Sequence, residues 1–431
     1  MSRILFTTMP MAGHLRPGLP IAERLVAAGH EVAWYTGANY EAEIARTGAR
    51  TIRMDPALDV DDARIAARDQ GGRAGLSALS RDITEVFIDP IPGWVAELDR
   101  VVAEFAPDVV VAEQGFMAGP LAGMRRGVPS VVFAVSPLGV SSVDTAPFGT
   151  GLLPGSRLRN RTLNWALRTV VLAAPQRAAE QVLERLGLPR RTSYFMDWGA
   201  EIAARYLVPT VPEFEYPRSD LPPSVEFVGP CLPGPARDWT PPAWWDDVLD
   251  ARAAGRPVVL VTQGTIATDP ANLVLPAVEG LGHREPLVVA TTVGFDADAV
   301  LPRPPANVRL TPFVPFTELL PLVDAVVTNG GYGGVQLALA HGVPLVVAGT
   351  TEDKSEVSSR VTWAGVGIAL RTDTPTAAQV RDAVGTALAD PSYRARAAAL
   401  QRVYAGYSGA DRAAEAVLEV AAGRRAASVP G

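Results

Sequence analysis

Short apolar runs of strand length alternate with helix-like stretches along almost the whole chain, and this alternation is what most limits the fold. In the first half the runs are RILFTT, EVAWYT, PDVVVA and PSVVFAV; in the second they are RPVVLVTQG, PLVVATT, NVRLTPF, DAVVTNGG and VPLVVAG. Strands buried on both faces read as continuous apolar runs, and the helices between them cover the two faces of a parallel sheet. The pattern predicts an α/β protein with doubly wound parallel sheets.

A proline-rich stretch, VPTVPEFEYPRSDLPPSVEFVGPCLPGP, separates the two groups of runs. Closely spaced prolines prevent a continuous helix and favour a stiff, extended connector. We therefore expect a Rossmann-like domain over residues 1–207, a linker over 208–242 and a second Rossmann-like domain over 243–405. The Ala-rich end, residues 406–431, predicts a helix that packs back on the first domain, followed by a disordered tail.

Charge and cysteine content exclude several classes of protein. The chain has 39 Lys and Arg against 46 Asp and Glu, a net charge of -7, so its long-range field would repel nucleic acid. The single cysteine, Cys231, excludes an internal disulfide and a Cys-based zinc cluster. No apolar run has the length of a signal peptide or a membrane span. We expect a cytoplasmic protein without stable membrane insertion, and a homodimer is an open alternative.

Two polar positions in the first half follow strands directly. In open parallel sheets, ligands bind beyond the carboxyl ends of the strands. This rule selects the loop over residues 9–15, which contains His14, and Glu113 after PDVVVA. An imidazole titrates near neutrality and can accept a proton, and a carboxylate on its other nitrogen fixes the tautomer. His14 and Glu113 are the predicted catalytic pair; the alternatives are a loop or capping histidine and a solvated strand end.

In the second half the same rule selects residues 263–265, 313–316, 329–334 and 349–354. The run TNGGYGGVQLALAHGVP is the most informative, because four glycines between a strand and a helix let the backbone approach an anion at the positive end of the helix dipole. A diphosphate would fit there without a lysine. Neither a Walker loop nor GxGxxG is present, which counts against an NTPase and a dehydrogenase. The two DxD strings, at 59–61 and 296–298, are interpreted as acidic loops, and no metal site is predicted.

Taken together, these motifs resemble the GT-B nucleotide-sugar glycosyltransferases that modify macrolides, flavonoids and other natural products, including UDP-glycosyltransferases. The resemblance is carried, in this order, by GHLRPGLPIAERLVAAGHEV, QGT, FVPFTELLPLVDAVVTNGGYGGVQLALAHGVPLVV and TEDKSEVSSRV. It spans both halves of the chain. It implies two Rossmann-like domains that face a cleft, with the acceptor in the first, the nucleotide sugar in the second, and no bound cofactor.

The resemblance also assigns roles to individual residues. His14 would take the proton of the acceptor hydroxyl, whose oxygen then attacks the anomeric carbon and inverts its configuration in one displacement. Phe313 would stack on the nucleotide base, the glycine loop would hold the phosphates, and Asp353 would face the sugar. The predicted donor-binding residues are Gly13, Gly264, Thr265, Phe313, Val314, Asn329, Gly330, Gly331, Tyr332, Gly333, Gly334, Gln336, Glu352, Asp353 and Lys354. The predicted acceptor-binding residues are Met11, Phe116, Met117, Ser136 and Phe148, for which ordinary interdomain packing is the alternative.

The chain departs from the family pattern at several of these positions. Asn329, Gly334 and Leu337 replace the usual histidine, small hydroxyl residue and ribose-binding glutamate. Because leucine cannot bond a ribose hydroxyl, Gln336 would have to substitute or that contact is absent. Glu113 stands where aspartate is usual, and Lys354 stands where glutamine is common in glucose-transferring members.

The sequence thus predicts an inverting, metal-independent hexosyltransferase that moves a sugar from a UDP- or dTDP-sugar to a hydroxyl of a small apolar natural product. Two alternatives stay open. One is a catalytically silent accessory or binding protein of the same fold, suggested by the altered donor residues. The other is a nucleotide-sugar epimerase of that fold.

Overall fold

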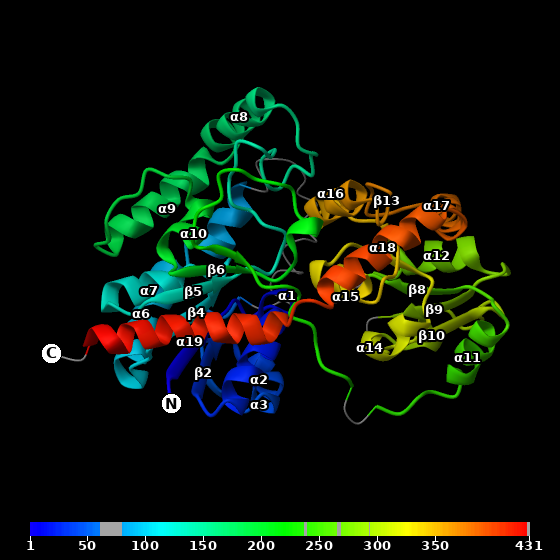
Figure 1. The fold of residues 1–431 in the computed structure, drawn as a ribbon, viewed down its shortest axis with the longest axis horizontal. Coiled ribbons are helices and arrows are strands. Elements are labelled where there is room, and N and C mark those ends of the chain that lie inside the picture. Colours follow the sequence, from blue (N-terminus) through cyan, green and yellow to red (C-terminus); the bar gives the residue numbers. More distant parts are fainter. Residues whose placement is uncertain (61–79, 237–238, 265–268, 293, 429–431) are drawn as a thin grey trace.

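Two parallel sheets form the framework of the computed structural model, which describes residues 1–60, 80–236, 239–264, 269–292 and 294–428 (Figure 1). The first sheet has seven strands in the order β3–β2–β1–β4–β5–β6–β7, and the second has six in the order β10–β9–β8–β11–β12–β13. The first contains β1 (Arg3–Thr7), β2 (Glu31–Thr36), β3 (Arg50–Arg53), β4 (Val109–Glu113), β5 (Ser130–Phe133), β6 (Arg205–Val208) and β7 (Val225–Phe227). The second contains β8 (Val258–Thr262), β9 (Leu287–Thr291), β10 (Val308–Thr311), β11 (Ala325–Thr328), β12 (Leu345–Val347) and β13 (Gly367–Ala369).

The central strands are apolar because both faces of each sheet are covered. All five residues of β4 are buried, as are all five of β8 and of β9. β1 and β4 run parallel, with Ile4 opposite Val109 and Thr7 opposite Ala112. The predicted doubly wound α/β architecture is confirmed in both halves.

Helices cover the two faces of the first sheet. On one face, α6 (Ile91–Phe105) buries Trp94, Leu98 and Val102, which recur every four residues and so form a single helical stripe. The other helices of this domain are α1 (Ala12–Leu15), α2 (Leu19–Ala27), α3 (Glu41–Arg46), α7 (Ala118–Arg126), α8 (Arg157–Ala166), α9 (Ala173–Arg185) and α10 (Trp198–Ile202).

The second sheet is covered in the same way. α12 (Val274–Leu281) and α17 (Ala377–Ala389) pack on one face, and α17 begins with a capping box formed by Thr376 and Gln379. The remaining helices are α11 (Trp245–Ala253), α13 (Ala297–Val300), α14 (Phe316–Leu319), α15 (Tyr332–Ala340), α16 (Lys354–Ala364) and α18 (Pro391–Tyr404).

The connection between the domains differs in one respect from the expected linker over residues 208–242. β7 lies inside that range and pairs with β6 in the first sheet, so the first domain extends beyond residue 207. A short strand at a sheet edge needs few residues, and the surrounding prolines do not prevent it because they lie outside the strand.

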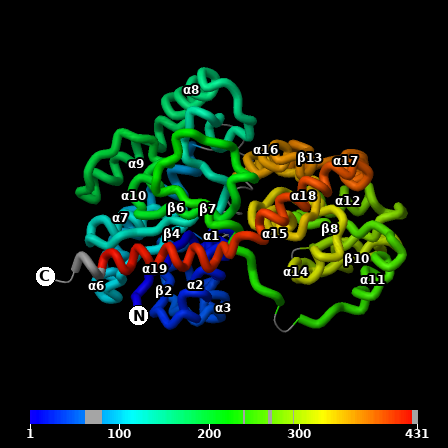
Figure 2. Tube along the Cα trace, in the orientation of Figure 1, coloured from blue at the N-terminus to red at the C-terminus, as the bar shows by residue number. Residues whose placement is uncertain are grey.

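The chain crosses back to the first domain at its end. α19 (Gly409–Ser428) lies along the first sheet beside α2, and Figure 2 shows it leaving the second domain to run along the first. It buries Ala413, Val417 and Ala421 in one cluster with Ile21 and Leu25 of α2. In the described part of the chain, no helix combines the length and the apolarity needed to cross a membrane.

Candidate active site

His14 and Glu113 meet at the carboxyl edge of the first sheet. His14 lies on the short helix α1, which follows β1, and Glu113 is the last residue of the neighbouring strand β4. Nδ1 of His14 lies 3.0 Å from Oε1 of Glu113. The histidine side chain is 23% exposed and the glutamate is fully buried, so the imidazole faces outward from a buried carboxylate.

Backbone amides hold that carboxylate in place. The N–H of Gly115 donates to Oε2 of Glu113 at 2.6 Å, and the N–H of Met9 donates to Oε1 at 3.4 Å. A Cβ at position 115 would lie 3.2 Å from the Glu113 oxygens and 3.2 Å from Cε1 of His14. The site therefore uses the small size of Gly115, which sequence reasoning missed because only the tertiary structure brings residue 115 against the imidazole.

The glycine-rich loop lies in the second domain, between β11 and α15. Gly330 has a φ of +89°, a conformation that favours glycine, and α15 begins at Tyr332 directly after the loop. A Cβ at Gly333 or Gly334 would meet no atom within 4 Å, so open space lies in front of this helix start. The arrangement can present backbone N–H groups to an anion, as the sequence predicted.

The side chain of Asn329 stabilises this loop through hydrogen bonds. Its Nδ2 donates to the carbonyl of Gln263, and its Oδ1 accepts from the N–H of Gly331 at 3.4 Å. Gly264, with a φ of +76°, lies beside it; a Cβ there would be 3.2 Å from the Asn329 amide. Asn329 thus connects two predicted donor loops. Thr265 lies outside the described residues.

Phe313 and Val314 follow β10 and face in opposite directions. Phe313 is 72% exposed, although it is a large aromatic residue, whereas Val314 is buried in the core of the second domain. The carbonyl of Phe313 accepts from the hydroxyl of Thr311 at 3.0 Å. An exposed ring on an anchored backbone is a suitable surface for stacking a nucleotide base.

Asp353 and Lys354 lie at the start of α16. Lys354 is buried, and its Nζ donates to Glu352 Oε2 and to Thr351 Oγ1. Burial raises the pKa of Asp353 to about 6; Lys354 and His14 lower it, and Glu352 raises it further.

Two predicted donor residues turn their side chains into the core instead. The carbonyl oxygen of Gln336 accepts from Tyr404 and, at 3.2 Å, from Thr210, and the side chain is buried. The ring of Tyr332 is also buried, which leaves only its backbone at the loop. Of the two alternatives for the ribose contact, the structure favours its absence over substitution by Gln336, because the helical spacing of α15 points this side chain at α18.

The predicted acceptor residues divide into core and cleft positions. Phe116 is fully buried, with its ring 4.9 Å from that of Trp94, and Met11 belongs to the same core cluster. Their expected role as acceptor walls is corrected, because both side chains are buried in this core. Phe116 turns inward after β4, where its N–H is bonded to the carbonyl of Glu113. Ser136 is buried and bonded to Gln114, whereas Met117 and Phe148 are only partly buried.

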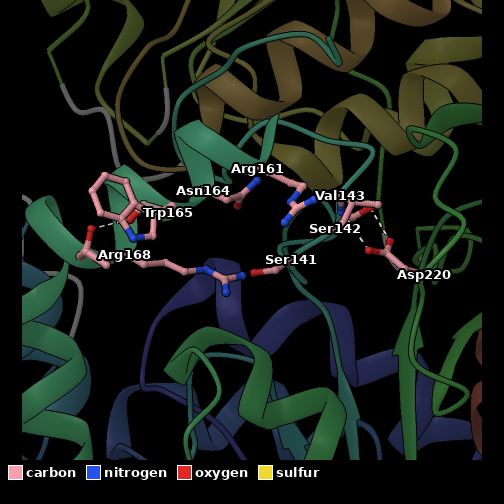
Figure 3. A pocket seen from close by; sticks show the side chains of 9 residues that line it. Ser141, Ser142, Val143, Arg161, Asn164, Trp165, Arg168 and Asp220 are labelled. Atoms are coloured by element: carbon pink, nitrogen blue, oxygen red, sulfur yellow. Dashed lines mark hydrogen bonds between the residues drawn. The ribbon is translucent and has the colours of Figure 1, made fainter. Parts of the chain in front are cut away.

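A pocket of about 360 Å³ opens in the first domain beside α8 (Figure 3). The side chains around it are Ser141, Ser142, Val143, Arg161, Asn164, Trp165, Arg168, Thr169 and Asp220. Its loop, residues 141–143, lies in the chain between the predicted acceptor residues Ser136 and Phe148, whereas the arginines and Trp165 were not predicted. The lining is mixed aromatic and cationic rather than purely apolar.

The acidic strings are not assembled into a metal site in the described residues. There, no group of three or more His, Cys, Asp or Glu side chains lies close enough to hold an ion. Asp296 caps α13, with its carboxylate accepting from the N–H of Asp298. Asp61 of the first string lies outside the described residues.

Comparison with known proteins agrees with this geometry. Residues 287–416 match the model "Erythromycin biosynthesis protein CIII-like, C-terminal domain", and residues 19–195 match "Glycosyl transferase 4-like domain". The chain is 43% identical over 413 residues to 4'-demethylrebeccamycin synthase of Lentzea aerocolonigenes, covering 94% of this chain and 96% of that protein. It is 31% identical to UDP-glycosyltransferase 2 of Phaeomoniella chlamydospora, covering 97% and 96%.

A solved structure supports the same assignment. The crystal structure of the glycotransferase of kitacinnamycin superposes with a TM-score of 0.74 at 25% identity, covering 97% of this chain and 98% of that one. Both domains of the present chain are therefore matched in sequence and in fold. The protein belongs to the GT-B glycosyltransferases of natural-product biosynthesis.

Proposed function

We propose that this protein is an inverting glycosyltransferase that moves a sugar from a UDP- or dTDP-sugar to a hydroxyl of a small, largely apolar natural product. The observation that carries the proposal is the 3.0 Å approach of His14 to the buried Glu113. This pair would supply the base, the start of α15 would supply the anion site and Asp353 would supply a carboxylate for the sugar, which is the set of groups that this reaction requires.

The chemistry follows from the tautomer of His14. With its proton on Nδ1, toward Glu113, the imidazole has its lone pair on Nε2. As the acceptor oxygen forms a bond to the anomeric carbon, its proton passes to Nε2 and the bond from that carbon to the diphosphate breaks. The imidazolium is stabilised by the Glu113 carboxylate. Attack opposite the leaving group inverts the anomeric configuration.

The leaving diphosphate would be stabilised by the second domain. The N–H groups at the start of α15 and the helix dipole favour its developing negative charge without a metal ion. Phe313 would stack on the base, and ionised Asp353 would accept hydrogen bonds from sugar hydroxyls. The relative named UDP-glycosyltransferase 2 supports UDP as one of the two candidate nucleotides.

The acceptor would lie between His14 and the loop that carries Phe148. The pocket beside α8 provides room for a further part of an aromatic acceptor, because Trp165 offers a stacking surface and Arg161 offers charge. The likeness to 4'-demethylrebeccamycin synthase supports a natural-product acceptor.

Calorimetric titration with UDP and dTDP, followed by turnover with the corresponding sugar nucleotides, tests the proposal. Binding of one nucleotide and transfer of its sugar to an acceptor, with inversion seen by NMR of the product, are the expected results. Nucleotide binding without transfer to any acceptor in a broad phenol and macrolide panel would favour the silent accessory protein. Interconversion of the sugar nucleotide without an acceptor would favour the epimerase.

A further inference from the structure

α16 turns a polar face toward the first domain. Glu356, Ser359 and Arg360 are spaced three and four residues apart, so they lie on one side of the helix, and all three are buried. Each contacts a group of the first domain or of the connector. The two domains are therefore joined here by buried hydrogen bonds and ion pairs rather than by apolar side chains alone.

Arg360 is the centre of this contact. Its Nε lies 2.8 Å from Oε1 of Glu215, its Nη1 lies 2.9 Å from Oε2 of Glu356, and its guanidinium lies 4.5 Å from the centre of the Tyr216 ring. All three charged groups are at most 3% exposed. Removing one partner of such a buried set leaves an uncompensated charge, so the set fixes the position of Glu356 tightly.

The other oxygen of Glu356 holds a loop of the first domain. Oε1 accepts from the N–H of Gly149 at 2.9 Å and from the N–H of Gly151 at 2.8 Å. A Cβ at Gly151 would lie 2.9 Å from the side chain of Ser355, so the loop approaches α16 closely. Phe148, whose ring packs beside Gly139, directly precedes these two bonded amides.

The helix α16 therefore carries predicted donor residues at its start and contacts the first domain one turn later. Its start carries Asp353 and Lys354, and its next turn carries Glu356. We propose that Glu356 is a positioning residue for the acceptor: its carboxylate holds residues 148–151 at a fixed distance from the donor sugar, and so governs acceptor affinity and choice rather than donor binding. This inference rests on the proposed function of the cleft.

Hydrogen exchange tests the contact without any need for turnover. In Glu356→Ala, amide exchange in peptides that cover residues 148–152 should rise about tenfold or more, because two hydrogen bonds to a charged acceptor are lost. Peptides from β1 and β4 should keep the wild-type rate. Glu356→Asp keeps the negative charge beside Arg360 but draws the oxygens back from the glycine amides, so it should fold normally and also exchange faster. Wild-type exchange at residues 148–152 in the aspartate variant would overturn the proposal.

Steady-state kinetics then separates positioning from general damage. With 4-methylumbelliferone as acceptor and UDP-glucose or dTDP-glucose as donor, Glu356→Asp should raise the acceptor KM about tenfold and leave the calorimetric Kd for the nucleotide within about twofold. Glu279→Gln, an exposed glutamate on α12, is the matched control and should behave as wild type. Equal losses in acceptor and nucleotide affinity would overturn the proposal. If wild type transfers no sugar to any acceptor of the broad panel, the proposed function fails, whereas hydrogen exchange still decides whether Glu356 holds the loop.

Discussion

The imidazole of His14 and the carboxylate of Glu113 form a pair in which Nδ1 and Oε1 lie 3.0 Å apart, with the carboxylate fully buried and the imidazole partly exposed. The two residues are 99 positions apart in the chain and meet because β1 and β4 are neighbours in the sheet. The buried Glu113 carboxylate, by accepting a hydrogen bond from the imidazole, orients the ring and stabilises its protonated form.

His14→Ala should reduce kcat by a factor of about 10²–10⁴, the usual contribution of a positioned general base. Binding of the nucleotide should persist, because its predicted contacts other than Gly13 lie in the second domain. The measurements are product formation and calorimetric titration with UDP or dTDP. His283→Asn, in an exposed turn with a φ of +57°, is the control and should retain wild-type turnover. Unchanged turnover in His14→Ala would remove the base assignment.

Glu113→Gln should lower kcat by about tenfold, less than loss of the histidine, because it removes the charge that favours the imidazolium but keeps the shape. Glu113→Asp should restore part of the rate. In a His14→Ala background the Glu113→Gln change should have little further effect, since the two residues act as one unit; additive losses would argue that Glu113 has only a structural role.

Gly115→Ala should reduce kcat several-fold while leaving nucleotide affinity intact. The added Cβ would lie 3.2 Å from both His14 and the Glu113 oxygens, so the pair must shift by a few tenths of an ångström. Gly385→Ala on α17 is the control, because its Cβ would meet no atom within 4 Å and alanine favours a helix. A Gly115→Ala enzyme with wild-type kcat would show that the pair tolerates this displacement.

Sugar transfer should fall as the pH drops through about 6, where Asp353 takes up a proton. One of its two carboxyl oxygens then no longer accepts hydrogen bonds from the sugar hydroxyls.

The same pKa also affects stability. Because burial raises the pKa of Asp353 above its unfolded value, the folded state binds more protons than the unfolded state between about pH 4 and 6. The favourable contribution of protonated Asp353 to stability is therefore present below this window and is lost as the pH rises through it. Asp353→Asn should have a higher Tm than wild type at pH 7.5, and the difference should shrink at pH 5; a pH-independent difference would contradict the raised pKa.

Phe116→Ala should lower the free energy of unfolding by about 3–5 kcal/mol, because the ring is fully buried between Trp94 and Tyr35. Denaturant unfolding checks this value. Met117→Ala changes the partly buried neighbour and should be milder. If Phe116→Leu changed acceptor KM without changing stability, the ring would belong to the acceptor site after all.

The sequence by itself determined the two α/β halves, their strands and the loops that carry the candidate chemistry. Apolar runs of four to six residues indicate burial on both faces of a parallel sheet. The glycines of TNGGYGGV indicate a backbone that can approach an anion closely. The edge strand β7 could not be predicted within the proline-rich stretch, because three residues are too few to show the alternation typical of a strand. His14 and Glu113 could be selected because the ends of parallel strands share one edge of the sheet.

Only the tertiary structure decided which way individual side chains face. Gln336 and Tyr332 lie on α15, which is buried on most of its surface, so its sequence does not indicate which side chains face the predicted donor site. Phe116 lies at a turn where its ring packs against Trp94, and this contact forms only in the tertiary structure. The contact of Glu356 with Gly149 and Gly151 joins residues about two hundred positions apart in different domains. Such contacts depend on how the two sheets are placed, and local periodicity carries no information about that placement.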